Sequence, residues 1–331
     1  MIGSANGACV SITGLGAHVP ERVYTNADLE QFVDTTDEWI VERTGIRERR
    51  FAEKEQALTD IALPAAQEAL RRAGVEAKDV DLIICATVTP DMMFPTSSAL
   101  LADTLGMPDA AAYDLLAGCT GFMYAIAQAY GMLASGLSKR ALVVGGDVLS
   151  KILDWSDRST LVLFGDGAGA VVMERVGEGG FLGFELGADG GGGGNLWLPG
   201  SGSRHFDEPD SFVKMNGPAV FKFATRVLVS SAEKVLAECG KTVADVDVYI
   251  PHQANKRIID HAAGKLGIPE EKVIVNVDRY GNTSSGSIPL ALAEAEADGR
   301  LREGELVLMT GMGAGLTWGS ALMEWTERTA A

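Results

Sequence analysis

Short apolar runs alternate along this chain with longer segments in which apolar residues recur at helical spacing. The apolar runs predict strands at residues 8–17, 81–88, 110–118, 140–146 and 246–250, and paired strands at 162–173. The helical spacing predicts helices at residues 26–33 (capped by Asn26), 58–73 and 97–105, and from Cys119 onward. Strands that alternate with helices predict an α/β fold in which parallel strands form the sheets and helices cover them.

The helix predicted after Cys119 is apolar on nearly all sides. Phe122, Met123 and Ile126 recur on one face, and Ala127 and Ala134 cover much of the other. A helix of this kind belongs in the core, so we expect it to lie between two sheets in a layered sandwich.

The second half of the chain repeats the first. Residues 70–84 align with residues 236–250 at a constant offset of 166 positions, which relates Gly74 to Gly240. Segment 164–174 is also similar to segment 310–320. This self-similarity indicates two copies of one helix–strand unit, and we divide the chain into an N-terminal half, 1–178, and a C-terminal half, 179–331.

Composition narrows the classes of partner and compartment. The net charge of −17 argues against nucleic acid as a partner. No apolar run is as long as a membrane span, and residues 1–7 carry no basic segment, so we expect neither a membrane anchor nor a signal peptide. The four cysteines form no C-x-x-C pair, which is typical of the reducing cytoplasm and argues against a structural zinc site.

Cys119 is the first candidate for chemistry. Gly118 and Gly121 flank it where a predicted buried strand meets a predicted buried helix, which indicates a tight turn with close backbone approach. The unpaired N–H groups and the dipole of a helix N-terminus favour the thiolate, so this cysteine is a candidate nucleophile. A small buried core cysteine is the alternative that this stretch leaves open.

Two further candidates for chemistry lie in the second half of the chain. His252 follows the strand predicted at 246–250, at the carboxyl end where ligands of α/β sheets bind. Asn282 lies in a turn that echoes the Cys119 turn, so a pseudo-two-fold axis would bring both to one cavity. A hydrogen-bonded loop histidine and an asparagine in an Asx turn are the structural alternatives.

Two other segments have compositions found at nucleotide sites. Segment 36–50 is the densest mixture of aromatic and basic residues, and a solvated helix with one buried tryptophan is its alternative. The glycine run 190–194 precedes no helix with Lys-Ser or Lys-Thr, so we expect a flexible surface loop there and no phosphate-binding loop.

Together the motifs resemble the thiolase-like condensing enzymes over nearly the whole chain, and most closely the β-ketoacyl-acyl carrier protein synthase III family. The stretches that carry the resemblance are Thr25-Asn-Ala-Asp-Leu, Asp37-Glu-Trp-Ile-Val, Cys119-x-Gly-Phe, Phe164-Gly-Asp-Gly-Ala-Gly-Ala, Pro251-His-Gln-Ala-Asn, Gly281-Asn-Thr-Ser and Thr317-Trp-Gly-Ser-Ala. The resemblance implies a five-layered α-β-α-β-α sandwich of two pseudo-repeated halves. It also implies a cytoplasmic enzyme that condenses an acyl-CoA primer with malonyl-acyl carrier protein, with decarboxylation, and so initiates fatty acid biosynthesis.

The resemblance also implies roles for individual residues. The implied catalytic set is Cys119, His252 and Asn282, with the backbone N–H groups of Cys119 and Ala314 as an oxyanion hole. The implied CoA site is Trp39, Arg43, Thr44, Arg158 and Asn255, with the adenine between Trp39 and Arg158. The implied docking surface for acyl carrier protein is Gln253, Ala254, Asn255, Lys256, Arg257 and Lys222.

The acyl pocket implied by the resemblance involves two chains. Its walls are Met312 and the Phe94 side chain that the partner subunit of a homodimer inserts. No metal and no cofactor are implied. Two positions depart from the family pattern, because Met312 stands where the family often has Phe, and Pro218 stands where an Asn often contacts pantetheine.

Three other functions stand against this one. A thiolase-like acyltransferase would move the acyl group from CoA to an oxygen or nitrogen acceptor through the same cysteine, without decarboxylation. A degradative thiolase would need a second cysteine near the C-terminal glycine loop, and no cysteine follows Cys239. A non-catalytic carrier-binding protein would lack one of the three catalytic residue types, and all three are present.

Overall fold

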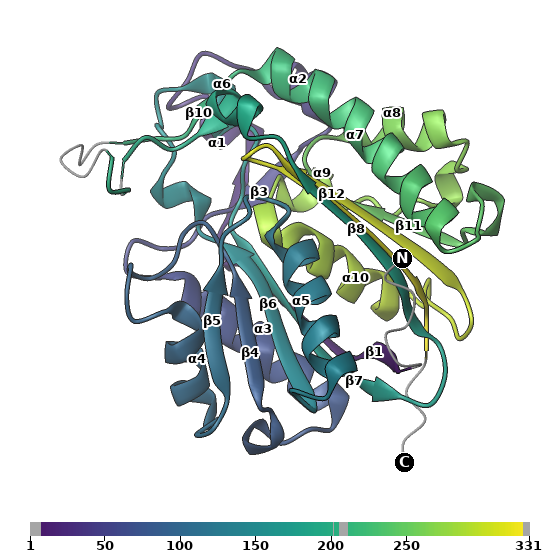
Figure 1. The fold of residues 1–331 in the computed structure, drawn as a ribbon. Coiled ribbons are helices and arrows are strands. Elements are labelled where there is room, and N and C mark those ends of the chain that lie inside the picture. Colours follow the sequence, from purple (N-terminus) through teal and green to yellow (C-terminus); the bar gives the residue numbers. More distant parts are fainter. Residues whose placement is uncertain (1–7, 201, 205–210, 327–331) are drawn as a thin grey trace.

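The described chain is organised around two mixed β-sheets, as seen in the computed structural model, which describes residues 8–200, 202–204 and 211–326 (Figure 1). The first sheet has the strand order β1-β7-β6-β4-β5. Its strands are β1 (Cys9–His18), β4 (Leu82–Ala86), β5 (Ala111–Leu115), β6 (Arg140–Asp147) and β7 (Gly167–Val176). The second sheet has the order β11-β12-β13-β8, with β8 (Gly180–Ala188), β11 (Val248–Pro251), β12 (Leu306–Gly313) and β13 (Thr317–Glu324).

Helices form three layers around these sheets. The central helices α5 (Gly121–Ser135) and α10 (Ser287–Ala297) contact strands of both sheets. The helices α3 (Leu58–Ala73) and α4 (Ser97–Leu105) pack on the first sheet, and α7 (Gly217–Glu238) and α8 (Lys256–Leu266) cover the second (Figure 1). The result is the expected α-β-α-β-α sandwich, with the apolar helix after Cys119 in its centre.

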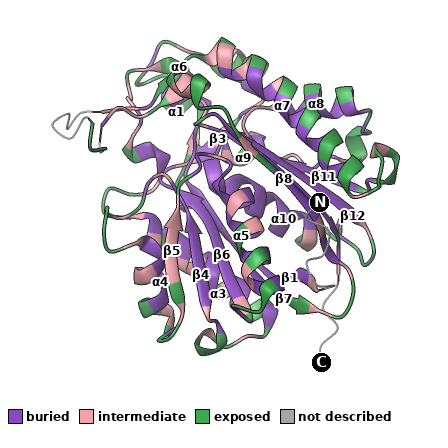
Figure 2. Cartoon of the chain, viewed as in Figure 1, coloured by how far each residue is buried: buried purple, intermediate pink, exposed green. Residues whose placement is uncertain are grey.

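Side-chain size explains how closely the layers pack. A Cβ atom on Gly14 or Gly16 of β1 would lie 2.3 or 2.0 Å from a backbone oxygen of α3, so glycines in the strand admit a helix rich in alanine. Figure 2 shows most strands of both sheets as buried and the edge strand β5 as only partly buried, whereas α7 and α8 carry exposed residues. The core therefore lies within the two sheets and between them, and the central helices pack in that space.

The internal repeat is visible in the topology. The 3-10 helices η2 (Ala77–Asp79) and η5 (Val243–Asp245) precede β4 and β11 at the same offset of 166 residues. The order β1-α3-β4-α4-β5-α5-β6-β7 returns as β8-α7-β11-α8-α10-β12-β13. The counterpart of β5 is reduced to a bridge between Tyr249 and Val273. The second half is thus a shortened copy of the first.

Some local predictions are wrong. The sheets are not purely parallel, because β7 pairs antiparallel with β1 and β6, and β13 pairs antiparallel with β8 and β12. Residues 162–173 form no strand pair, since the segment before β7 instead makes a bridge from Phe164 to Asn282. A pairing partner 118 positions away in the chain leaves no local signature.

Two polar segments also differ from expectation. The helix α1 (Asn26–Leu29) is capped by Thr25, which shares a capping box with Asp28. Asn26 is buried and bonds Asp37 and Arg49 instead. The glycine run forms a 3-10 helix, η4 (Gly190–Asn195), where a loop was expected. The remaining elements are α2 (Asp37–Thr44), α6 (Arg158–Leu161), α9 (Val277–Tyr280), η3 (Leu149–Lys151), η6 (Glu270–Lys272), η7 (Ser284–Gly286), β2 (Val23–Thr25), β3 (Glu48–Arg50), β9 (Leu196–Trp197) and β10 (Lys214–Met215).

Candidate active site

A cavity of about 960 Å³ is lined by Cys119, His252 and Asn282 together. Cys119 precedes α5, His252 follows β11, and Asn282 follows α9. A nucleophile from the first half therefore shares one cavity with an imidazole and a carboxamide from the second. A volume of this size is in the range of small-molecule binding sites.

Two turns meet backbone to backbone at the thiol. Gly118 has a φ of 58°, and a Cβ there would lie 2.7 Å from the backbone nitrogen of Ala314. A Cβ on Gly313 would lie 2.5 Å from the nitrogen of Cys119. Thr317 holds the turns together, because its hydroxyl contacts the carbonyl oxygens of Ala117 and Ala314, each at 2.9 Å. The tight turn expected around Cys119 is confirmed.

The surroundings of the thiol act on its pKa in opposing directions. Burial raises the pKa of Cys119 to about 11, although the nearby Ser284 hydroxyl and, less strongly, the backbone N–H groups of Cys119 and Ala314 favour the anion. The helix α5 begins at Gly121, two positions beyond the cysteine. Desolvation therefore opposes the thiolate that the helix terminus was expected to favour.

His252 is held as a neutral imidazole. Its backbone N–H donates to the oxygen of Thr310 at 2.7 Å, and its Nδ1 lies 2.5 Å from Ser287 Oγ. Burial lowers the pKa of this ring to about 4. Its Nε2 is buried without a hydrogen-bond partner among the described residues. A hydroxyl hydrogen directed at Nδ1 leaves the ring hydrogen on Nε2, where a ligand can accept it.

Asn282 is fixed through its backbone and through one end of its amide. Its N–H donates to the oxygen of Leu163 at 2.8 Å, and its carbonyl accepts from Gly165 at 3.0 Å. Its Oδ1 accepts from the N–H of Ser284 at 2.9 Å. Ser284 has a φ of 53°, a strained value for a residue other than glycine. This arrangement leaves the Nδ2 hydrogens for a ligand.

Comparison with known proteins identifies the family. The model of 3-oxoacyl-[acyl-carrier-protein (ACP)] synthase III matches residues 113–190, and the model of its C-terminal part matches residues 236–325. The β-ketoacyl-[acyl-carrier-protein] synthase III of Desulfitobacterium hafniense (strain Y51) is 51% identical over 326 residues, which are 96% of this chain and 98% of that one. That of Symbiobacterium thermophilum is 53% identical over 323 residues, with the same coverage.

This chain belongs to the β-ketoacyl-acyl carrier protein synthase III family. The synthase III of Thermus thermophilus, which has a crystal structure, is 50% identical to this chain in sequence. The two structures superpose with a TM-score of 0.91 over 96% of this chain and 100% of that one. The thiolase-like fold that the motifs implied is thereby confirmed.

The mouth of the cavity in this synthase III family member is a stack of cations on an aromatic ring. The guanidinium carbons of Arg43 and Arg158 lie 4.7 and 4.6 Å from the ring centroid of Trp39. Arg158 also donates to the oxygen of Asp34 at 2.7 Å. An adenine between Trp39 and Arg158 would need about 7 Å. Their contact leaves no such slot in the free chain, so a base must displace Arg158 to stack there.

Other residues of the expected CoA and acyl sites are also placed. Thr44, Asn255, Met312 and Pro218 all line the cavity. Thr44 is buried, and its hydroxyl donates to the oxygen of Ile40. Pro218 has neither a polar side chain nor a backbone N–H, so it offers this cavity no hydrogen-bond donor. The softer side chain of Met312 is 3% exposed and forms part of the wall.

The residues expected on the carrier-protein surface differ in how exposed they are and in whether their side chains are already bonded within the chain. Arg257 and Lys222 are exposed, and Lys256 pairs with Asp260 at 2.7 Å. Asn255 caps α8, because its Oδ1 accepts from the N–H of Arg257 at 2.9 Å. Ala254 is partly exposed beside them.

Gln253 is an exception among the predicted docking residues. It is 1% exposed, and its amide bonds only internal groups. It cannot present its side chain to a carrier protein, so its assignment to the docking surface is corrected. The prediction grouped Gln253 with residues 254–257 because they follow it in the sequence. Neighbours in sequence can differ in burial, and Gln253 is buried.

Phe94 lies on an exposed loop. Its side chain is 82% exposed, beside Met93 at 70%, and it is not part of the cavity wall that the described residues form. Met92, Met93 and Phe94 together form a run of exposed apolar side chains, and contiguous apolar surface of this kind is typical of interaction sites. Phe94 therefore has no role in its own cavity, and its place in the acyl pocket of a partner stays a prediction.

Motif reasoning missed the residues that hold the catalytic set in place. Ser287, Ser284 and Thr317 each bond a residue of the set or its turn. Ser284 and Thr317 lie inside family motifs that gave them no role of their own, and Ser287 lies outside those motifs. Within the described ranges, no group of three or more His, Cys, Asp or Glu side chains could hold a metal ion. None of the helices in the described part of the chain combines the length and apolar character needed to cross a bilayer.

Proposed function

We propose that this chain condenses an acyl-CoA primer with malonyl-acyl carrier protein, releases carbon dioxide, and forms a 3-oxoacyl-acyl carrier protein that initiates fatty acid biosynthesis. The observation that carries the proposal is the shared cavity of Cys119, His252 and Asn282. A thiol and two hydrogen-bond donors around one space match a reaction that needs a nucleophile and a stabilised enolate. Membership of the synthase III family supports the same activity.

The first step loads the primer. The sulfur of Cys119 loses its proton and attacks the thioester carbonyl carbon of the acyl-CoA. The bond from that carbon to the CoA sulfur breaks, and CoA leaves as a thiol with a proton. The N–H groups of Cys119 and Ala314 donate to the carbonyl oxygen while it carries negative charge. The two turns that carry these N–H groups meet at the thiol, which supports this assignment.

The second step builds the new carbon–carbon bond. The bond between the malonyl carbon and its carboxylate breaks, and the electron pair forms an enolate on the thioester. His252 Nε2 and Asn282 Nδ2 donate to the enolate oxygen, which carries full charge only at this stage. The enolate carbon attacks the acyl carbonyl on Cys119, the carbon–sulfur bond breaks, and the cysteine thiolate takes up a proton.

A neutral histidine suits this step. A buried imidazolium would gain stability from any nearby anion and hold it before the transition state, whereas a neutral N–H donor acts mainly on the developing charge. Burial lowers the pKa of His252 to about 4, so the ring is neutral at working pH. The thiol, the imidazole and the amide carry every step, so we propose no resident metal or cofactor.

The partners follow from the same proposal. Acyl-CoA enters past Trp39, Arg43 and Arg158, and acyl carrier protein docks on Ala254 to Arg257 and on Lys222. A homodimer places Phe94 of each subunit at the acyl pocket of the other. All four cysteines, each within the described residues, are free, which supports a cytoplasmic location.

Acyl transfer to an oxygen or nitrogen acceptor is the second candidate. It would use the loaded Cys119 but leave both enolate donors without a task, and His252 Nε2 has no partner in the described chain to occupy it. The test is incubation with radiolabelled acetyl-CoA followed by malonyl-acyl carrier protein. We expect label on Cys119 that chases into 3-oxoacyl-carrier protein. Label that stays on the cysteine favours acyl transfer elsewhere, and no label at all favours a binding protein.

A further inference from the structure

The amide of Gln253 is fully occupied inside the protein. Its Nε2 donates to the oxygens of Pro251 at 2.8 Å and Ile274 at 3.1 Å. Its Oε1 accepts from the N–H groups of Asn276 at 2.9 Å and Val277 at 3.2 Å. The carboxamide has two donors and two acceptor positions, and all four are used. A buried side chain with such saturated bonding has a structural task at this place.

Part of that task is to bond the N–H groups at the start of α9. The N-terminal N–H groups of a helix need partners from outside it. Within the described chain, the N-cap residue Asn276 makes no side-chain cap hydrogen bond to its own helix. The two N–H groups that Gln253 Oε1 accepts are those of Asn276 and of the first helical residue, Val277. Gln253 therefore supplies the cap that the local sequence lacks.

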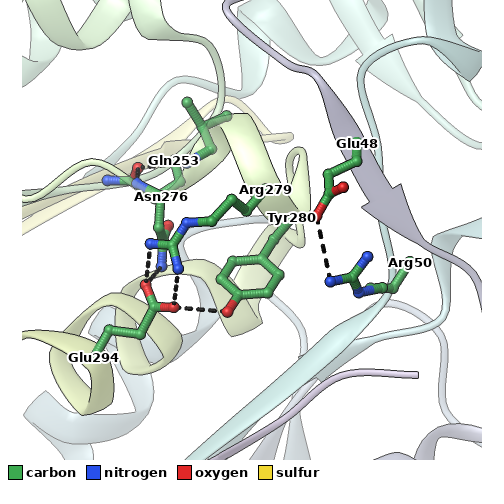
Figure 3. Close-up of polar contacts among 8 residues, drawn as sticks. Glu48, Arg50, Gln253, Asn276, Arg279, Tyr280 and Glu294 are labelled. Carbon is green, nitrogen blue, oxygen red and sulfur yellow. Dashed lines mark hydrogen bonds and ion pairs between the residues drawn. The ribbon is translucent and has the colours of Figure 1, made fainter. Parts of the chain in front are cut away.

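Glu294 of α10 holds the same helix from its other side. Its carboxylate accepts from Asn276 Nδ2 at 2.8 Å and from the Tyr280 hydroxyl at 2.6 Å. It also accepts two hydrogen bonds from Arg279, at 2.8 and 3.0 Å. Figure 3 shows these three side chains converging on Glu294, with Gln253 beside Asn276. The helix is thus bracketed between a glutamine at its start and a carboxylate along its length.

Both ends of this bracket lead to the proposed enolate donors. The helix α9 ends at Tyr280, two positions before Asn282. At the other end, Gln253 follows His252 directly, and its backbone N–H donates to Ser287 Oγ at 3.3 Å. The same hydroxyl lies 2.5 Å from His252 Nδ1. Gln253 thus contacts Ser287, which lies against the imidazole of His252. It also contacts the start of α9, the helix that precedes Asn282.

We propose that Gln253 is a positioning residue that sets His252 Nε2 and Asn282 Nδ2 at the spacing needed to bind one enolate oxygen, with Glu294 as the second arm of the bracket. The proposal rests on the proposed function above. Two donors serve one oxygen only if both lie within hydrogen-bond distance of it, and a misplacement of about 1 Å can cost about a hundredfold in rate. Loading of Cys119 uses neither donor, so it is not affected.

The test compares Gln253→Met, Glu294→Ala and the wild type as full-length proteins. Acetyl-CoA loading of Cys119, followed by mass spectrometry, counts competent sites and measures the first step. Malonyl-carrier protein then gives the rates of decarboxylation and condensation per loaded site. For Q253M we expect loading within about twofold of wild type and condensation reduced about 10- to 100-fold. For E294A, which keeps the glutamine cap, we expect the same pattern with a smaller reduction.

A matched control separates positioning from general stability. Ser231→Ala removes a buried hydroxyl that bonds Glu185 at 2.5 Å and Ser320 at 2.7 Å, outside the cavity lining. It should lower the melting temperature without changing the ratio of condensation to loading. An unchanged ratio in both bracket variants, or the same changed ratio in S231A, overturns the proposal. If Q253M does not fold, E294A decides, because its contacts lie nearer the surface. A wild type that loads but forms no 3-oxoacyl product overturns the proposed function instead.

Discussion

Ser287 Oγ lies 2.5 Å from Nδ1 of His252, whose other ring nitrogen has no hydrogen-bond partner in the part of the chain that the structure describes. Because Ser287 Oγ already accepts from the N–H of Gln253 at 3.3 Å, we expect its own hydrogen to point at Nδ1 and so to select the tautomer with hydrogen on Nε2. In Ser287→Ala the imidazole loses that selection, because neutral rings with hydrogen on Nδ1 cannot donate from Nε2. We expect malonyl-carrier protein decarboxylation to fall about tenfold or more, since one oxyanion donor is then only partly present. Loading of Cys119, measured by mass spectrometry, should be unchanged, and an equal loss in both steps would contradict the assignment.

Asn282 offers its Nδ2 hydrogens because Ser284 occupies its Oδ1. In Asn282→Ala the enolate loses a donor, so we expect loading to persist while condensation falls about 100- to 1,000-fold. Single-turnover assays with labelled acetyl-CoA separate the two steps. Asn282→Asp is the matched control, because it keeps the size and the acceptor for Ser284 but replaces the donor. It should resemble N282A, and near-normal condensation in N282D would exclude the amide as a donor.

The buried thiol predicts an unusual pH dependence. Burial raises the pKa of Cys119 to about 11, so the thiolate fraction grows tenfold per pH unit below that value. The rate of alkylation by iodoacetamide, followed by mass spectrometry on the Cys119 peptide, should rise about tenfold per unit between about pH 7 and pH 9. A plateau that begins near pH 7 would show a thiolate in the resting chain. Cys119→Ser gives the background from the other cysteines.

The cation stack at the mouth should serve CoA and not the carrier-bound substrate. In Trp39→Ala the adenine loses its aromatic partner, so we expect KM for acetyl-CoA to rise about tenfold with little change in kcat at saturation. The malonyl group arrives on a carrier protein without an adenine, so KM for malonyl-carrier protein should stay the same. Steady-state kinetics with each substrate varied in turn measure both values. A parallel rise in both would place Trp39 in general cavity structure.

Exposed cations should steer the acidic carrier protein. In the double variant K222E/R257E we expect kcat/KM for malonyl-carrier protein to fall at least about tenfold at low salt, with the difference shrinking as salt rises. Loading from acetyl-CoA should change far less. Lys241→Glu is the charge-matched control for the single variant K222E, because each changes the net charge by −2 and that exposed lysine follows α7 away from the cavity lining. An equal effect of K241E would indicate a response to net charge alone.

Much of the architecture could be predicted from local patterns. The helices at 58–73 and 97–105 match α3 and α4 to the residue, since their apolar spacing and the glycines that follow them are local signals. Segment 162–173 failed because a long-range bridge, from Phe164 to Asn282, replaces the local strand pair. Gln253 was misassigned for a related reason, because exposure depends on packing and not on neighbours in sequence.

The sequence alone determined the two-fold internal repeat, the buried helix after Cys119 and the identity of the three reactive residue types, because periodicity and residue chemistry are properties of the chain itself. Only the tertiary structure decided that the three share a cavity, that burial raises the pKa of the Cys119 thiol, and that Arg158 closes the stack on Trp39. Desolvation and hydrogen-bond partnership arise between segments that are distant along the chain. Folding must bring these segments together before desolvation or a hydrogen-bond partner can change the properties of a residue.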